Sequence, residues 1–191
     1  MRIIAGKYRG RKLKSPPSLQ TRPTSDRLRE TLFNILAPRI EGTRFLDLCA
    51  GSGGVGIEAL SRGAAHVTFV DRSRRMCALI EANLDPLGVS EDQIEIVASE
   101  ASDFLKRRAK QSSSRSAKAN AVDLIFFDPP YADDYEPVLD LLGKHADVFL
   151  TPGAVIVVEH HCKHDLNEEF GSLYRYRIVK QGESCLSFFG G

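Results

Sequence analysis

Short apolar runs alternate along this chain with segments in which apolar residues recur every three or four positions. The runs have the length of buried strands and lie at residues 44–48, 66–70, 94–98, 122–127 and 154–160. Helical spacing separates them, and its clearest instance is the set Met76, Leu79, Ile80 and Leu84. Because strands that alternate with helices bury their faces in layers, the pattern predicts an α/β fold with a largely parallel sheet.

Capping residues mark where the helices begin and end. Ser25 and Ser73 are candidate N-caps, and Pro38 and Gly63 follow the ends of the first two helices. We expect further helices around Phe104, over 135–142 and near Leu166, and two closing strands over 174–179 and 185–189.

A glycine-rich turn follows the first predicted strand. Gly51, Gly53 and Gly56 satisfy the G-x-G-x-x-G spacing, which allows a tight turn and close approach of a ligand to the backbone. Asp71 comes 20 residues after Gly51, at the end of the second strand, where an acid accepts both hydroxyls of an adenosine ribose. The spacing fits a nicotinamide dinucleotide as well as S-adenosylmethionine.

Asp128, Pro129, Pro130 and Tyr131 directly follow the apolar run 122–127. The prolines fix φ and remove two backbone donors, so the carbonyls of Asp128 and Pro129 are free to face a ligand. Together with the Asp128 carboxylate they form acceptors for an amino group, and Tyr131 offers a face on which a base stacks. An ordinary turn after a buried strand is the alternative interpretation.

One further carboxylate favours the methyl donor over the nicotinamide. Asp47 precedes the glycine turn, where a pyrophosphate is repelled and a cationic sulfonium or amino group is attracted. A group that accepts hydrogen bonds from an amine also has no use in hydride transfer; Asp128 to Tyr131 form such a group, which we call the amine reader. The sequence therefore indicates S-adenosylmethionine.

Positive charge gathers at the N-terminus, although the net charge is +1. Residues 1–44 hold eleven Lys or Arg and three acids, a balance of +8, which leaves −7 for the remainder. Such asymmetry is typical of a surface that binds a polyanion, whereas a solvated charged hairpin is the alternative. Tyr8, Gly6 and Gly10 suit a β-hairpin that approaches a phosphate backbone closely. The expected RNA contacts are Arg2, Lys7, Arg9, Arg11, Lys12 and Arg22.

These residues together resemble the RsmD family of 16S ribosomal RNA guanine-N2 methyltransferases. The resemblance is carried by residues 1–13, 22–34, the glycine turn, 128–131, Gly182, Leu186 and Phe188. The Asp-Pro-Pro-Tyr motif is shared with other amino methyltransferases, so it indicates the chemistry. The N-terminal motifs are what narrow the resemblance to this family. The family implies a Rossmann-like, seven-stranded methyltransferase sheet over 25–191, with a basic β-hairpin extension over 1–24. It implies S-adenosylmethionine as methyl donor and a guanine N2 amine in the small-subunit rRNA as acceptor.

The resemblance also assigns site residues. Catalysis falls on Asp128, Pro129, Pro130 and Tyr131, and the cofactor pocket on Asp47, Gly51, Ser52, Gly53, Asp71 and an acid after the third strand. Relatives commonly have Asp followed by Ala at that last position. This chain has Ser99-Glu100-Ala101, so Glu100, with its longer side chain, is the equivalent.

Composition fits a single cytoplasmic enzyme, expected to be a monomer. The 191 residues, 42% of them hydrophobic, allow one sizeable core, and no apolar run approaches the roughly 20 residues that span a bilayer. The four cysteines lie far apart, which argues against zinc ribbons and disulfide frameworks. Residues 160–164 read His-His-Cys-Lys-His, and an exposed strand exit is favoured there over a metal site.

Residues 106–120 carry six positive charges and no negative ones. They are expected to form a mobile surface insertion, and a solvated loop is favoured over RNA contact.

Two other functions remain open. The same fold could methylate adenine or cytosine in DNA or a protein amide, although the chain lacks a separate target-recognition domain. A non-catalytic RNA-binding module for ribosome assembly is the second alternative. The presence of both the glycine turn and Asp128 to Tyr131 argues against such a module.

Overall fold

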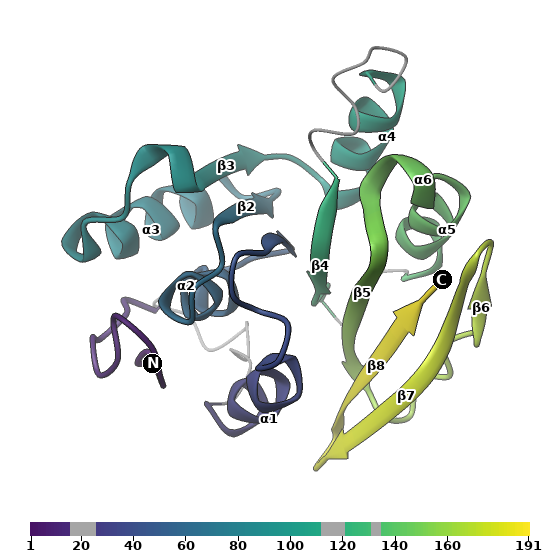
Figure 1. Ribbon diagram of the computed structural model, residues 1–191, viewed down its shortest axis with the longest axis horizontal. Coiled ribbons are helices and arrows are strands. Elements are labelled where there is room, and N and C mark those ends of the chain that lie inside the picture. Colours follow the sequence, from purple (N-terminus) through teal and green to yellow (C-terminus); the bar gives the residue numbers. More distant parts are fainter. Residues whose placement is uncertain (16–25, 112–120, 131–134) are drawn as a thin grey trace.

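The computed structural model describes residues 1–15, 26–111, 121–130 and 135–191 (Figure 1). Its strands are β1 Arg44–Leu48, β2 His66–Asp71, β3 Ile94–Ala98, β4 Val122–Phe127, β5 Leu150–His161, β6 Glu169–Phe170, β7 Leu173–Gln181 and β8 Ser184–Gly190. Its helices are α1 Asp26–Leu36, α2 Gly54–Ser61, α3 Arg74–Leu84, α4 Ala101–Gln111, α5 Glu136–Lys144 and α6 Ala146–Phe149, with short 3-10 turns at Asp85–Leu87 and Glu91–Gln93.

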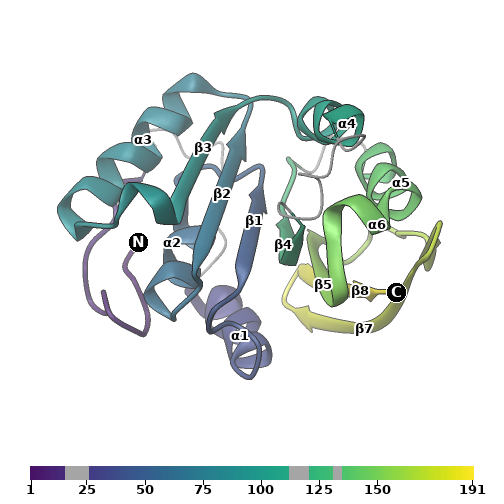
Figure 2. The ribbon, with the colours of Figure 1, turned by 45° about the horizontal axis from the view of Figure 1, so that its top comes forward.

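The eight strands of the described residues form one sheet in the order β3-β2-β1-β4-β5-β8-β7-β6. The first five strands pair in parallel, and β8 runs antiparallel to both β5 and β7. Figure 2 shows β3, β2 and β1 side by side, with the rest of the sheet beyond them. The predicted α/β fold is confirmed, with one strand more than expected, because the two-residue β6 pairs with β7 at the edge.

Helices cover both faces of the sheet, because neighbouring residues of a strand point to opposite sides. Phe45 and Phe126 belong to one core cluster, with α1, α2 and α3. Leu46 and Phe127 belong to a second core cluster, with α4, α5 and α6. Strands β1, β2 and β4 and the second half of β5 therefore read as largely apolar runs, because both of their faces are buried, whereas β3 at the edge of the sheet is half exposed.

The expected short helix near Leu166 is wrong. The chain between β5 and β6 contains turns and no helix among its described residues, and α6 instead precedes β5. Leu166 is nevertheless buried, and its carbonyl accepts a hydrogen bond from Arg175 Nη1 at 3.1 Å. Burial of a single loop leucine gives the same apolar signal as a short helix, so the sequence could not separate them.

The N-terminal segment forms a loop that packs on α2. One antiparallel bridge, Arg2 to Lys12, closes it, and Ile3, Tyr8 and Leu13 are buried in the core. A Cβ added at Gly6 would lie 1.7 Å from the Ser61 carbonyl oxygen. Gly6 and Tyr8 therefore serve the packing of the loop against the protein, and not the approach of a phosphate backbone.

Helix α4 extends further than the sequence indicated. It continues to Gln111, so residues 106–111 are helical and the expected insertion is wrong for them, while 112–120 lie outside the described residues. Arg107 Nη2 donates to Ser99 Oγ at 2.7 Å, and Arg108 lies 3.8 Å from Glu95 and above the Phe104 ring. Two of the six charges therefore stabilise the fold.

The expectation of no disulfide is also wrong. Cys162 and Cys185 are bonded, with their Cα atoms 5.1 Å apart. Antiparallel pairing of β5 with β8 places His160 opposite Cys185, and this pairing brings together two cysteines 23 residues apart. His160 is buried and hydrogen-bonded to Ser187 Oγ at 2.9 Å.

Within the described ranges, no three His, Cys, Asp or Glu side chains gather as metal ligands. No helix in the same ranges is long and apolar enough to cross a membrane.

Candidate active site at the carboxyl edge of the sheet

The carboxyl ends of β1, β2 and β4 meet at one edge of the sheet. Leu48 at the end of β1 is level with Val70 of β2 and Phe127 of β4. The backbone amide of Asp128 donates to the Leu48 carbonyl oxygen at 3.3 Å. The strand order reverses between β1 and β4, and such a reversal opens a crevice for ligands outside the carboxyl ends.

The turn after β1 bends sharply through three residues of positive φ. These are Cys49 at 63°, Gly51 at 55° and Gly53 at 78°. Left-handed geometry costs a non-glycine residue roughly 1–2 kcal/mol, so the fold holds Cys49 under strain, as occurs at functional sites. A Cβ added at Gly51 would meet nothing within 4 Å, whereas one at Gly56 would lie 2.3 Å from Phe69 Cε1. The first glycine thus leaves the ligand side open, and Gly56 lets α2 pack on the sheet.

Asp71 fixes this turn to the end of β2. Its Oδ2 accepts from the Gly51 amide and its Oδ1 from the Ser73 amide, both at 2.8 Å. Each carboxylate oxygen has a second lone pair that is suited to a ligand hydroxyl. Asp71 therefore orders the glycine turn in addition to its predicted contact with a ribose.

Asp47 lies beneath the turn and is 2% exposed. Its Oδ2 accepts from the Gly56 amide at 2.9 Å, inside the first turn of α2. Burial raises the pKa of Asp47 to about 7; the charge of Asp71 adds to the rise, and the bond from Gly56 opposes it. A cation bound nearby would favour the ionised carboxylate.

Ser52 is tied to the N-terminal loop through Asn83, a buried side chain that the sequence did not single out. Asn83 Nδ2 donates to the carbonyl oxygens of Ser52 at 3.0 Å and Lys14 at 3.1 Å, and its Oδ1 accepts from the Lys14 amide at 2.7 Å. The basic loop and the glycine turn thus share one anchor.

Glu58, fully buried on α2, is a second anchor, and no sequence motif marks it. It accepts from the amides of Ile4 at 2.8 Å and Ala5 at 3.0 Å, and from Arg62 Nε at 2.7 Å. Arg29 lies 3.8 Å from it, and burial lowers the pKa of that arginine. An acid in the otherwise apolar run 54–60 was the available signal.

Glu100 lies where the prediction placed it, beyond the end of β3 and at the start of α4. The Ser99 amide donates to the Asp71 carbonyl oxygen at 3.0 Å, which brings this segment beside the end of β2. The Glu100 carboxylate is exposed and lies 3.7 Å from Arg72 Nη1. An exposed ion pair of this kind is weak, so the Glu100 carboxylate can leave Arg72 and accept a hydrogen bond from a ligand at little cost.

The amine reader is described in part. Asp128 is half-buried, Pro129 is buried and Pro130 is exposed, while Tyr131 lies outside the described residues. The structure thus brings Asp128, at the end of β4 as the sequence predicted, beside the turn that follows β1.

Five of the six predicted RNA contacts are exposed on the N-terminal loop: Arg2, Lys7, Arg9, Arg11 and Lys12. Arg22 lies outside the described residues. Arg29, which contributes to the positive charge of this region, is 1% exposed and is unavailable to RNA.

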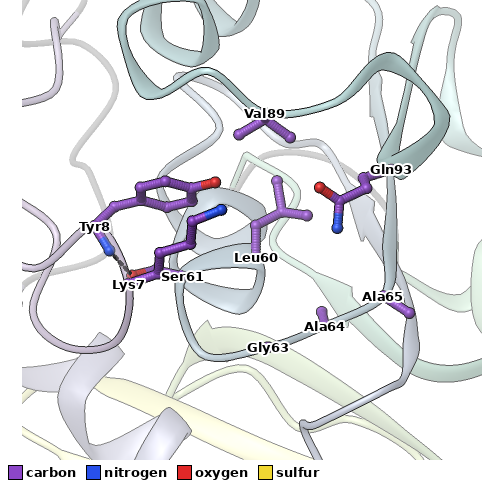
Figure 3. Close-up of a pocket in the computed structure, with 9 residues that line it drawn as sticks. All are labelled: Lys7, Tyr8, Leu60, Ser61, Gly63, Ala64, Ala65, Val89 and Gln93. Atoms are coloured by element: carbon purple, nitrogen blue, oxygen red, sulfur yellow. Dashed lines mark hydrogen bonds between the residues drawn. The ribbon is translucent and has the colours of Figure 1, made fainter.

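A cavity of about 210 Å³ lies beside the same loop, between Tyr8, Leu60 and Gln93 (Figure 3). Its other residues include the segment from α2 to the start of β2, which is the amino edge of the sheet. The Lys7 ammonium lies 5.1 Å from the Tyr8 ring centre at its mouth. This cavity is remote from the glycine turn and Asp128, so the strand ends, and not the cavity, define the candidate active site.

Solved structures define the class. A methyltransferase structure from Escherichia coli is 33% identical, with a TM-score of 0.81, and the match covers 99% of this chain and 96% of that one. A hypothetical protein from Thermus thermophilus is 30% identical, with a TM-score of 0.79 over 98% of each chain. The sheet, the glycine turn and the acids at its edge are those of an S-adenosylmethionine-dependent methyltransferase.

The family follows from sequence comparison. A family model described as Conserved hypothetical protein 95 matches residues 1–190. The ribosomal RNA small subunit methyltransferase D of Escherichia coli K12 is 38% identical over 96% of this chain and 93% of its own length. The protein of the same name from Haemophilus influenzae is 41% identical over 83% and 78%. The chain belongs to this family, the RsmD family, as its residues predict.

Proposed function

We propose that this protein transfers a methyl group from S-adenosylmethionine to the exocyclic N2 amine of a guanine in 16S rRNA. The hydrogen bond from the Asp128 amide to the Leu48 carbonyl oxygen is the observation that supports the proposal most directly, because Asp128 then lies next to the end of β1, where the glycine turn begins. The names of the relatives, small subunit methyltransferases, support the rRNA substrate.

Residues around the β1 turn fit the methyl donor. Gly51 and Gly53 give the open, tight backbone, and the second lone pairs of Asp71 accept the ribose hydroxyls. Asp47 adds negative charge below a cationic ligand, and Glu100 accepts from the adenine amine. When bound, S-adenosylmethionine supplies an electrophilic methyl group on a positively charged sulfur.

Asp128 and Pro129 act on the acceptor. The guanine N2 amine is conjugated and weakly nucleophilic. Hydrogen bonds from its two N–H groups to the Asp128 carboxylate and the Pro129 carbonyl concentrate its lone pair toward the methyl donor. Tyr131 stacks on the base, and the amine releases one proton as it gains the methyl group.

The N-terminal loop holds the RNA. Its exposed cations, Arg9, Arg11 and Lys12 among them, contact phosphates without reading sequence. The target guanine has to be unpaired or flipped from its stack to reach Asp128. We propose that a cytoplasmic monomer acts on 16S rRNA or on the small ribosomal subunit.

Mass mapping of nucleosides tests the proposal. Purified protein is incubated with labelled S-adenosylmethionine and either 16S rRNA or small subunits that lack the modification. N2-methylguanosine at one position is the expected product, and D128A should abolish it. Label in adenine, in cytosine or in protein would instead show that the acceptor is misassigned.

A further inference from the structure

Two tyrosines of β7 stand out on the surface of the protein. Tyr174 is 54% exposed and Tyr176 is 50% exposed, and with Ile178 they make up the exposed large hydrophobic side chains of the described residues. Exposed aromatic rings on an outer strand are an aggregation liability, so their presence indicates a binding role.

Both tyrosines lie on one face of the sheet, and a β-bulge brings Arg177 to the same face. Tyr174 is level with Gly190 and Arg177 with Phe188, and the register shifts between Arg175 and Arg177. The Tyr176 ring lies 6.4 Å from the Phe188 ring, and a Cβ added at Gly190 would lie 3.5 Å from it. Tyr174, Tyr176 and Arg177 therefore share the Phe188 face.

Ile178 points to the other face. It is level with Ser187, and side chains of neighbouring residues along β8 alternate between the two sides. Ile178 is therefore a matched control on the same strand.

Two guanidinium groups lie on the same part of this face. The Arg177 guanidinium lies 5.7 Å from the centre of the Phe188 ring. Arg39, which follows α1, donates to the Gly153 carbonyl oxygen at 3.0 Å. The Tyr176 ring and the Ala154 carbonyl oxygen lie 3.5 and 3.8 Å from a Cβ added at Gly190, which brings Arg39, bound to Gly153, to the same part of the surface. Burial raises the pKa of Tyr176, and the charges of Arg39 and Arg177 oppose that rise. Flat rings beside fixed cations match the bases and phosphates of single-stranded RNA.

The location fits an extended RNA substrate. Phe188 belongs to the core cluster that also contains Ile3 and Tyr8, and Val179 packs against that cluster, so the tyrosines lie on the same face of the sheet as the basic loop. Figure 1 shows the N-terminal loop and β7 on either side of α1. One RNA could therefore contact the loop, cross α1 and reach β7.

We propose that Tyr174, Tyr176, Arg39 and Arg177 form a second RNA contact, which stacks unpaired bases of the substrate away from the target guanine. The proposal rests on the rRNA substrate of the proposed function. These residues lie near Gly153 and Gly190, at the amino end of β5, whereas Asp128 is at the carboxyl edge. The contact therefore acts on RNA binding and not on methyl transfer itself.

The test compares Y174A/Y176A, I178A and Y176F in binding to a 16S rRNA transcript and in methyl transfer. The double variant should raise the RNA Kd and the KM by about tenfold or more, because each lost stack weakens binding severalfold. Its kcat, its affinity for S-adenosylmethionine and its melting temperature should match wild type. Y176F keeps the ring and should bind normally, as should I178A. The variant R39Q/R177Q should flatten the salt dependence of binding.

Several results would overturn the proposal. Wild-type RNA affinity in Y174A/Y176A would do so, as would an equal loss in I178A. Sedimentation that showed a wild-type dimer and a monomeric double variant with unchanged RNA binding would assign the surface to a second copy of the chain. If wild type makes no N2-methylguanosine yet binds RNA through the tyrosines, the proposed function fails and the contact stands. If wild type makes N2-methylguanosine and the double variant does so with an unchanged KM, the proposed function stands and the second RNA contact fails.

Discussion

The Asn83 side chain donates a hydrogen bond from Nδ2 to the carbonyl oxygen of Ser52, at 3.0 Å, and the same side chain binds Lys14 through two hydrogen bonds. Ser52 belongs to the glycine turn of the proposed cofactor site, and Lys14 lies one residue before the end of the described part of the basic loop. A single buried amide therefore joins the proposed cofactor and RNA sites.

Replacing Asn83 with alanine should weaken both sites. The change leaves buried backbone groups without partners, and we expect a loss of about 1–3 kcal/mol of folding stability together with weaker S-adenosylmethionine binding. Thermal melting and calorimetry measure the two effects. The exposed Asn34 on α1 provides the matched control, N34A, which should change neither. Normal cofactor affinity in N83A would show that the turn orders itself without this anchor.

Replacing Asp71 with alanine should weaken S-adenosylmethionine binding. Each lost charge-assisted hydrogen bond is worth about 1.5–3 kcal/mol, and the Gly51 and Ser73 amides lose their acceptor as well. Calorimetry with the methyl donor measures the change, with the exposed Asp92 replaced in D92A as control. An unchanged Kd would place the ribose elsewhere.

Replacing Asp128 with asparagine should lower kcat by about 100-fold or more, because a placed carboxylate is removed from the reacting amine. The Kd for S-adenosylmethionine should stay within a few fold of wild type. Single-turnover methylation of rRNA measures the rate, and D140N, at an exposed position on α5, is the control. A wild-type rate in D128N would contradict the amine-reader assignment.

Asp47 should make cofactor binding depend on pH. Its pKa is about 7 in the folded protein and near 3.8 in the unfolded chain. Ionisation of Asp47 therefore disfavours the folded state, and its contribution lowers folding stability as the pH rises from about 4 to about 7. A bound cation favours the ionised form, so affinity for S-adenosylmethionine should rise about tenfold from pH 5.5 to pH 8. Calorimetry across this range measures it. D47N should remove both dependences, and a pH profile shared by wild type and D47N would assign them to another group.

The basic loop should control the salt dependence of RNA binding. Neutralising Arg9, Arg11 and Lys12 to glutamine should remove about 0.7–0.9 from the slope of log K against log salt for each lost phosphate contact. Cofactor binding should be unchanged. Fluorescence anisotropy with rRNA at several salt concentrations measures the slope.

The control for the loop neutralises exposed lysines elsewhere, at Lys106, Lys144 and Lys163. Deletion of residues 106–118 is a poorer control, because Arg107 and Arg108 bind Ser99 and Glu95. An equal loss of slope in the lysine control would place the RNA on another face.

Local sequence signals were sufficient for most of the helices and strands and for the position of several proposed site residues in the fold. Each strand is a short apolar run, and each acid of the site stands at or just beyond the end of one. In a parallel sheet these ends gather at one edge, so Asp71 and Asp128 could be placed beside the Gly51 turn from spacing alone. The N-cap at Ser73 could likewise be predicted from the sequence, because its side chain accepts a hydrogen bond from the Met76 amide only three residues away.

Other contacts depend on how distant segments pack, and no local pattern encodes that. Asn83 meets Lys14 across 69 residues, Glu58 meets Ile4 across 54, and Cys162 meets Cys185 only because β8 pairs antiparallel with β5. From the sequence alone, Tyr8 could either contact RNA or belong to the core. In the structure it is buried in the core. The sequence by itself determined which acids and glycines stand at the strand ends, where we propose that the chemistry takes place. Tertiary packing decided which charges are buried and which segments are anchored, because burial and pairing are properties of surfaces that only the folded chain brings together.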